Sequence, residues 1–263
     1  MTGKLEATNQ SMINNLNMKN KLRFYKEGIN TPDNRILIFE VIKLFIQNNA
    51  DQRRINLVTA KLNQKELLNE FFNDPNAAKN ATKGVKFPGT PLNYVHGNLS
   101  GYFTDTEVVI ALGLNSYELL ELDKKSNSKC LIAIPSRINE IEKWVRITNA
   151  QTLPAENVLR PYAEPECILK EALKAVTSIN PAHTGLRDHE QDAIKSMFSA
   201  LKKYAVPAEK DIIESHLYRS YELPKSLIDA ILKVYEAVSG GKKIAGKVSN
   251  EKSSFERWKA NCK

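Results

Sequence analysis

The sequence predicts a helix-rich α+β fold, with a small central β-sheet followed by a helical C-terminal bundle. Three short apolar runs separated by turn residues lie within residues 105–134, which is typical of strands. From residue 165 onwards, apolar residues recur every three to four positions, which predicts amphipathic helices. The expected parts are a polar N-terminal arm (1–30), an α/β central domain (31–150), a helical bundle (151–240) and a basic tail (241–263).

In the first part of the chain, the hydrophobic pattern predicts two helices. Residues 33–48 are apolar nearly all round, which favours a buried helix, although residues 36–39 also suit a strand. Residues 63–74 place large apolar side chains on one helical face, and Pro75 ends that helix. Residues 75–104 contain glycines and prolines throughout, so we expect a long irregular loop there.

The central apolar runs predict a β-meander. They span residues 107–112, 117–122 and 129–134. A helix is then expected over residues 137–147, with Trp144 on its apolar side. Four further amphipathic helices make up the bundle, and the last of them ends at Gly240. These four begin near Pro165, Asp188, Ala208 and Pro224. The tail after Gly240 is expected to be mobile, with Trp258 as a contact.

The net charge of +8 and the pI near 9.2 indicate a protein that attracts polyanions. Residues 1–100 carry 14 Lys and Arg against 8 Asp and Glu, and residues 201–263 carry 13 against 8. Residues 101–200 carry 11 against 14, so two basic ends flank an acidic middle. The basic ends predict DNA or RNA as the partner. The lysines expected to contact phosphates are Lys79, Lys83, Lys86, Lys242 and Lys243.

Other features bear on the compartment. No run of about 18 apolar residues occurs, so we expect neither a transmembrane helix nor a membrane partner. The N-terminus lacks the apolar stretch of a secretory signal. The cysteines are odd in number and widely spaced (Cys130, Cys167 and Cys262), which argues against a disulfide framework and against a Cys-based zinc site. A cytoplasmic protein is expected, and a homodimer is left open.

Residues 103–125 hold the side chains that favour catalysis most. In the predicted meander, Asp105 begins one strand, while Glu121 and Asp123 end the next and point the same way. Three carboxylates at one sheet edge repel each other unless a hard dication such as Mg²⁺ neutralises them. Such an ion activates water for phosphodiester hydrolysis, and Lys124 adds positive charge beside the scissile phosphate.

This order of an acid at the start of one strand, then an acid and a lysine at the next, resembles the restriction-endonuclease-like, or PD-(D/E)XK, nucleases. The resemblance covers residues 105–124. It implies a Mg²⁺-dependent DNA endonuclease in which Asp105, Glu121 and Asp123 hold the metal and Lys124 assists. Asp123 stands where these nucleases normally have the lysine, and Lys124 follows one residue later.

The same stretch also suits a helix-turn-helix, so a non-enzymatic DNA-binding protein is the main alternative. Thr106 then caps a helix that ends at Leu112, Gly113 makes the turn, and Asn115 caps a recognition helix over residues 116–124. A plain β-hairpin without chemistry is a further interpretation. The third class is a protein-interaction module whose acidic middle and basic ends engage another protein.

Overall fold

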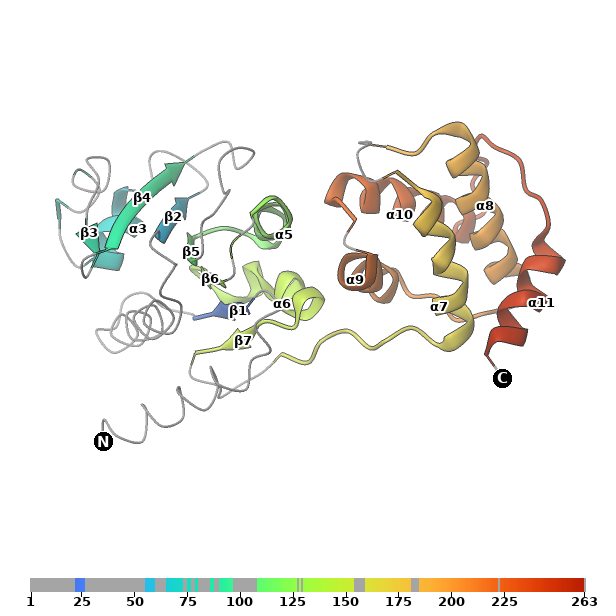
Figure 1. Ribbon diagram of the computed structural model, residues 1–263, viewed down its shortest axis with the longest axis horizontal. Coiled ribbons are helices and arrows are strands. Elements are labelled where there is room, and N and C mark those ends of the chain that lie inside the picture. The colour runs from blue at the N-terminus through green and yellow to red at the C-terminus, as the bar shows by residue number, and fades with distance from the viewer. Residues whose placement is uncertain are drawn as a thin grey trace. The chain divides into compact units, whose positions relative to one another are not determined.

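The structure is a computed structural model, shown in Figure 1. It describes residues 22–26, 55–59, 65–72, 75–76, 79, 86–87, 90–96, 108–126, 128, 130–153, 159–180, 185–221 and 223–262. The chain divides into two compact units, residues 1–160 and 161–263. The first unit combines a sheet with helices, and the second is helical in its described residues. The predicted helix-rich α+β class, with a sheet followed by a helical C-terminal region, is therefore confirmed.

The first unit is built on a mostly parallel sheet. Its strand order is β3-β4-β2-β5-β6-β1-β7. The edge pair β3–β4 is antiparallel, and all other neighbours are parallel. Every residue of β2, β5 and β6 is buried, because helices cover parallel sheets on both faces. The strands are Leu22–Tyr25 (β1), Ile55–Thr59 (β2), Lys86–Phe87 (β3), Thr90–His96 (β4), Val108–Leu112 (β5), Cys130–Ile134 (β6) and Gln151–Thr152 (β7).

Helix α5 (Ser116–Lys125) connects β5 to β6. Of the three predicted strands, those at 107–112 and 129–134 are confirmed as β5 and β6, whereas the strand at 117–122 is wrong. The meander is wrong for the same reason. Because β5 and β6 are parallel neighbours, the chain must cross back between them, and a helix makes that crossover.

A capping box explains why α5 is a helix. The Asn115 side chain accepts a hydrogen bond from the Glu118 backbone N–H at 3.1 Å, and the Glu118 carboxylate accepts one from the Asn115 N–H at 2.9 Å. The helix-turn-helix interpretation is thus right about the Asn115 cap and the helix that follows. It is wrong about the preceding helix, since residues 108–112 form β5.

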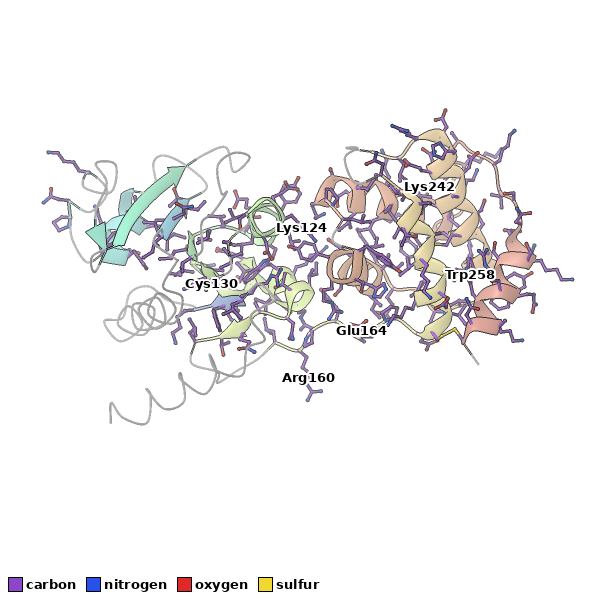
Figure 2. The ribbon with its side chains drawn as sticks, viewed as in Figure 1. Lys124, Cys130, Arg160, Glu164, Lys242 and Trp258 are labelled. Atoms are coloured by element: carbon purple, nitrogen blue, oxygen red, sulfur yellow. A yellow bond between two sulfur atoms is a disulfide. The ribbon has the colours of Figure 1, made fainter. Side chains whose placement is uncertain are left out.

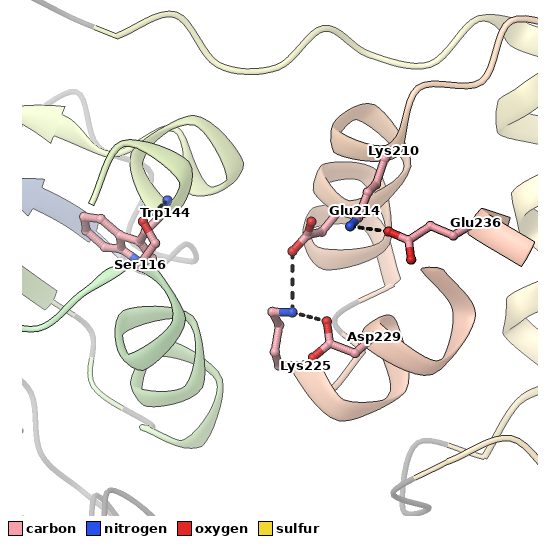
Figure 3. A network of polar contacts seen from close by, with 7 residues as sticks. All are labelled: Ser116, Trp144, Lys210, Glu214, Lys225, Asp229 and Glu236. Atoms are coloured by element: carbon pink, nitrogen blue, oxygen red, sulfur yellow. Dashed lines mark hydrogen bonds and ion pairs between the residues drawn. The ribbon is translucent and has the colours of Figure 1, made fainter. Parts of the chain in front are cut away.

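Two helices of the first unit confirm sequence predictions. Helix α3 (Lys65–Phe72) lies within the predicted helix 63–74. Helix α6 (Glu142–Thr148), preceded by a 3-10 turn, lies at the predicted helix 137–147. Trp144 on α6 is fully buried, and its backbone N–H donates to Ser116 Oγ at 3.2 Å, which holds α6 against the start of α5 (Figure 3).

Two other predictions for the first unit fail. The expected irregular loop at 75–104 contains β4, a seven-residue strand that pairs with β2. The expected N-terminal arm contains β1, whose Phe24 and Tyr25 are buried and which pairs with β6 and β7. Both strands are set by pairing with distant segments, which local composition does not reveal. The predicted helix 33–48 lies outside the described residues.

The second unit packs its helices through apolar faces. Helix α8 contacts α7, α10 and α11, and α9 contacts α10 (Figure 1). The apolar stripe of α8, including Ile194 and Leu201, is buried as predicted. No helix among the described residues is both long and apolar enough to cross a membrane. The helices are Cys167–Leu173 (α7), Asp188–Lys203 (α8), Lys210–Tyr221 (α9), Lys225–Ser239 (α10) and Glu251–Asn261 (α11), with a 3-10 helix at Lys174–Ser178 (η2).

The expected mobile tail is instead packed against α8. Lys195 Nζ donates to the carbonyl oxygens of Ile244 at 2.9 Å and Gly246 at 2.6 Å. The Asp192 carboxylate accepts a hydrogen bond from the Lys247 N–H at 2.7 Å. These contacts fix the loop that leads from α10 into α11. The tail prediction is therefore wrong, because polar side chains of α8 hold a segment that has few apolar residues of its own.

A disulfide closes the second unit. Cys167 at the start of α7 and Cys262 just after α11 are bonded, with their Cα atoms 5.8 Å apart. The expectation of no disulfide is wrong, because folding brings together two cysteines that are 95 residues apart in the sequence. Trp258 is buried on α11, as its predicted role as a contact requires.

Candidate nucleic-acid interface

The carboxylates expected to hold a metal lie on the second half of α5. Glu121 and Asp123 are two positions apart, and on a helix this separates them by about 200° around the axis. On a strand the two side chains would point to the same face, but on this helix they do not. Asp105 lies outside the described residues. Within the described ranges, no three His, Cys, Asp or Glu side chains are grouped so that they could hold a metal ion.

Asp123 is buried and paired. Its side chain has no exposed surface, and its Oδ2 accepts a hydrogen bond from Arg23 Nε on β1 at 2.7 Å. The next residue, Lys124, is half-buried. Because α5 runs back along the sheet, its end lies at the amino-terminal edge of the strands. Ligand sites of open α/β sheets lie at the opposite, carboxyl edge. Position and pairing both assign Asp123 the role of tying α5 to β1.

Replacing Arg23 tests this role. Arg23→Ala is expected to lower the free energy of unfolding by about 1–3 kcal/mol, because the buried Asp123 carboxylate loses its charged donor. Arg146→Ala is the control, since it breaks the partly exposed i,i+4 pair with Glu142 and is expected to cost less than about 1 kcal/mol. Denaturant unfolding followed by circular dichroism measures both. Stabilisation by Mg²⁺ that disappears in Asp123→Asn would instead indicate a metal ligand.

Of the lysines expected to contact phosphates, the structure describes the side chains of three. Lys79, Lys242 and Lys243 are exposed, as a phosphate contact requires. Lys83 lies outside the described residues, and Lys86 belongs to the edge strand β3. Lys242 and Lys243 are the pair around which further charges gather.

These further charges come from the end of α8. Lys202 Nζ donates to two carbonyl oxygens in the last turn of α10, at 2.8 and 3.1 Å, and so lies beside the segment that carries Lys242 and Lys243. Lys203 follows it, and all four lysines are exposed. We call Lys202, Lys203, Lys242 and Lys243 the basic cluster; Figure 2 labels Lys242 beside α8.

An aromatic pair adjoins the basic cluster. The rings of Tyr204 and Phe255 stack with their centroids 4.0 Å apart and their planes 8° from parallel, and both residues are half-buried. Lys203 Nζ lies 6.0 Å from the centre of the Tyr204 ring. Positive charge beside aromatic rings is typical of surfaces that grip single-stranded nucleic acid.

Two carboxylates near the basic cluster are already paired. Glu251 lies 2.9 Å from Lys203 Nζ, and this hydrogen bond raises the pKa of Lys203. Glu236 pairs with Lys210, which lowers the pKa of Glu236 more than nearby Lys242 does. Figure 3 shows this ion pair between α9 and α10, together with the pairs that Lys225 makes with Glu214 and Asp229. Glu251 offsets one of the four lysine charges and Glu236 is paired outside the cluster, so the cluster keeps an excess of positive charge.

Sequence reasoning found half of this surface. It selected Lys242 and Lys243 from a run of basic residues, but it did not select Lys202, Lys203 or the aromatic pair. The signal available was the Lys-Lys-Tyr sequence at the end of α8, whose lysines bond to residues 36 to 48 positions further along the chain. Their convergence depends on the packing of α8, α10 and α11.

Comparison with known families gives a match for the helical unit but not for the first unit. Residues 165–259 are similar to a family described as a domain of unknown function (DUF1889). The match lies within the second unit and covers all or most of α7 to α11. No curated protein matches the chain significantly.

Proposed function

We propose that the protein binds nucleic acid through the basic cluster of its C-terminal unit. The observation that carries this proposal is the convergence of four exposed lysines from two separate segments beside a stacked aromatic pair. Phosphodiester backbones present regularly spaced negative charge, and neutralising it releases counterions. The aromatic rings add a surface on which a base stacks. DNA and RNA share this chemistry, and the experiment below includes both.

The described residues support binding more than cleavage. The metal site implied by the resemblance to PD-(D/E)XK nucleases required Glu121 and Asp123 on one face, and the helix separates them. Endonuclease activity therefore stays a prediction. Cleavage is measured by incubating plasmid DNA with Mg²⁺ and either the native protein or Asp105→Ala. Loss of cleavage in that variant would support the nuclease.

A nucleic-acid partner accords with the cytoplasmic location expected from the sequence, which we retain as a proposal. The Cys167–Cys262 disulfide is more typical of oxidising compartments. Alkylation of intact cells, followed by mass spectrometry of Cys167, distinguishes the two locations. Free thiols in the cell support the cytoplasm, and a fully oxidised pair contradicts it.

Charge reversal in the basic cluster tests the proposed function. The double variant Lys242→Glu/Lys243→Glu is expected to bind labelled single-stranded RNA, single-stranded DNA and duplex DNA at least about tenfold more weakly, because phosphate attraction becomes repulsion. Fluorescence anisotropy at low salt measures the affinity.

The control is Lys170→Glu/Lys259→Glu, which changes the charge equally. Both control lysines are exposed and lie within about one turn of the disulfide, Lys170 on α7 and Lys259 on α11. Lys259 is about 12 Å along the helix from Glu251. We expect this variant to bind within about twofold of the native protein. An equal loss in both variants contradicts the basic cluster. No binding by the native protein contradicts the function and favours the protein-interaction module.

A further inference from the structure

A second feature of the helical unit is a cavity of about 390 Å³ between α8, α11 and the segment formed by α7 and η2. We call it the α11 pocket. Two alanines and the small exposed parts of Met197 and Trp258, which are 3 % and 5 % exposed, provide its apolar surface. Arg257 and the hydroxyl groups of Ser196 and Ser254 provide polar surface. Its volume and its mixed lining are typical of sites for small organic molecules.

The charge in the α11 pocket favours an anion. Two cations line it, Lys174 and Arg257, together with one carboxylate, Glu171. Glu171 pairs with Lys174 and also accepts a hydrogen bond from Asn261 Nδ2 at 2.9 Å. These two donors, Lys174 first, lower the pKa of Glu171, so its charge is already compensated. Arg257 is exposed and has no ion-pair partner in the described parts of the chain.

The lining of the pocket includes a polar residue in the left-handed backbone conformation. Asn250, at the start of α11, has a φ of 57° and a ψ of 23°, and its carboxamide does not cap the helix. Asparagine adopts the left-handed region more readily than most residues other than glycine, and residues in that region cluster at binding sites. The neighbouring Ser249 N–H donates to Ser196 Oγ at 3.1 Å, which fixes this segment to α8. Asn250 thus lines the pocket, and its side chain makes no capping hydrogen bond to α11.

We infer that the α11 pocket binds a small organic phosphate that carries a flat ring, with a nucleoside monophosphate as the representative ligand. The planar guanidinium of Arg257 matches a phosphate with two parallel hydrogen bonds. Ala175 and Ala193, with the narrow exposed edges of Trp258 and Met197, offer apolar contact to a ring. The inference is independent of the proposed function, because the pocket and the basic cluster share no residue.

Calorimetric titration of the full chain with its disulfide intact tests the inference. AMP is expected to bind with a Kd below about 1 mM. Adenosine and inorganic phosphate, each of which offers one half of the ligand, are expected to bind at least about tenfold more weakly than AMP. CMP, GMP and UMP complete the set of probes.

Two variants and one charge control locate the site. Arg257→Gln is expected to weaken AMP binding at least about tenfold, because it removes the charged donor. Lys259→Gln removes the same charge from α11 outside the pocket and is expected to change binding less than about twofold. Ala193→Phe fills the pocket from an exposed position of α8 without changing its charge, and it is expected to abolish binding.

Three results overturn the inference. One is the absence of binding of all four mononucleotides at about 10 mM. Another is AMP binding that survives both Arg257→Gln and Ala193→Phe. The third is phosphate binding as tight as AMP binding, which removes the role of the ring. Lys242→Glu/Lys243→Glu should keep the AMP affinity of the native protein, so a failure of the proposed function is distinguished from a failure of the pocket.

Discussion

Removing the Cys167–Cys262 disulfide is expected to lower the free energy of unfolding of the helical unit by about 2–5 kcal/mol. The bridge joins residues 95 positions apart, from the first residue of α7 to the residue after α11. Nearly the whole unit therefore lies inside the closed loop. In the chain-entropy account, a loop of this length restricts the unfolded chain strongly, and the stabilisation grows with the logarithm of its length.

The two tryptophans allow this loss to be measured in one unit. Trp144 belongs to the first unit and Trp258 to the second, so a Trp144→Phe background leaves Trp258 as the reporter. In that background, Cys167→Ser/Cys262→Ser is expected to unfold at a lower denaturant concentration than the parent. Cys130→Ser, which lies on β6 outside the bridge, is the control. An unchanged midpoint in the double variant contradicts a stabilising bridge.

Trp144→Ala is expected to destabilise the first unit by about 3–5 kcal/mol. The side chain of Trp144 is fully buried and is the largest such side chain described. It lies on α6, which packs against α5 and is held there by the hydrogen bond to Ser116. Truncation removes apolar contact and leaves a cavity that these helices close only in part.

Amide hydrogen exchange measures the loss of stability in the first unit. The amides of β5 and β6 should exchange faster in Trp144→Ala, since they open with the unit that contains them. Tyr117→Ala, which truncates an aromatic residue of α5 that is 57 % exposed, should cost less than about 1 kcal/mol. Equal exchange in the native protein and in Trp144→Ala contradicts the role of Trp144 in the core.

Sequence patterns predicted the fold best where burial is uniform or periodic. The runs at 108–112 and 130–134 are buried throughout, and a continuous apolar run indicates such a strand. The stripe of α8 follows the helical period. Residues 117–122 mislead because Tyr-Glu-Leu-Leu-Glu-Leu suits either period over so short a length. The capping box of Asn115 and Glu118 decides for the helix, and both residues were visible in the sequence.

The site was harder to predict because its parts come from distant segments. Arg23 and Asp123 are 100 positions apart, so no local pattern shows that a carboxylate expected to bind a metal is already paired. Lys203 meets Glu251 across 48 positions in the same way. The sequence predicted that Lys242 and Lys243 are exposed, because they follow the end of a helix. Their neighbours, the disulfide and the α11 pocket follow only from the packing of the helices.

The salt dependence of nucleic-acid binding tests the central claim most directly. For the native protein, the logarithm of the binding constant should fall linearly with the logarithm of salt concentration. In Lys242→Ala/Lys243→Ala the magnitude of that slope should decrease by about 2, because two phosphate contacts are lost. A slope that stays the same in this variant, or affinity that does not depend on salt, would contradict binding through the basic cluster.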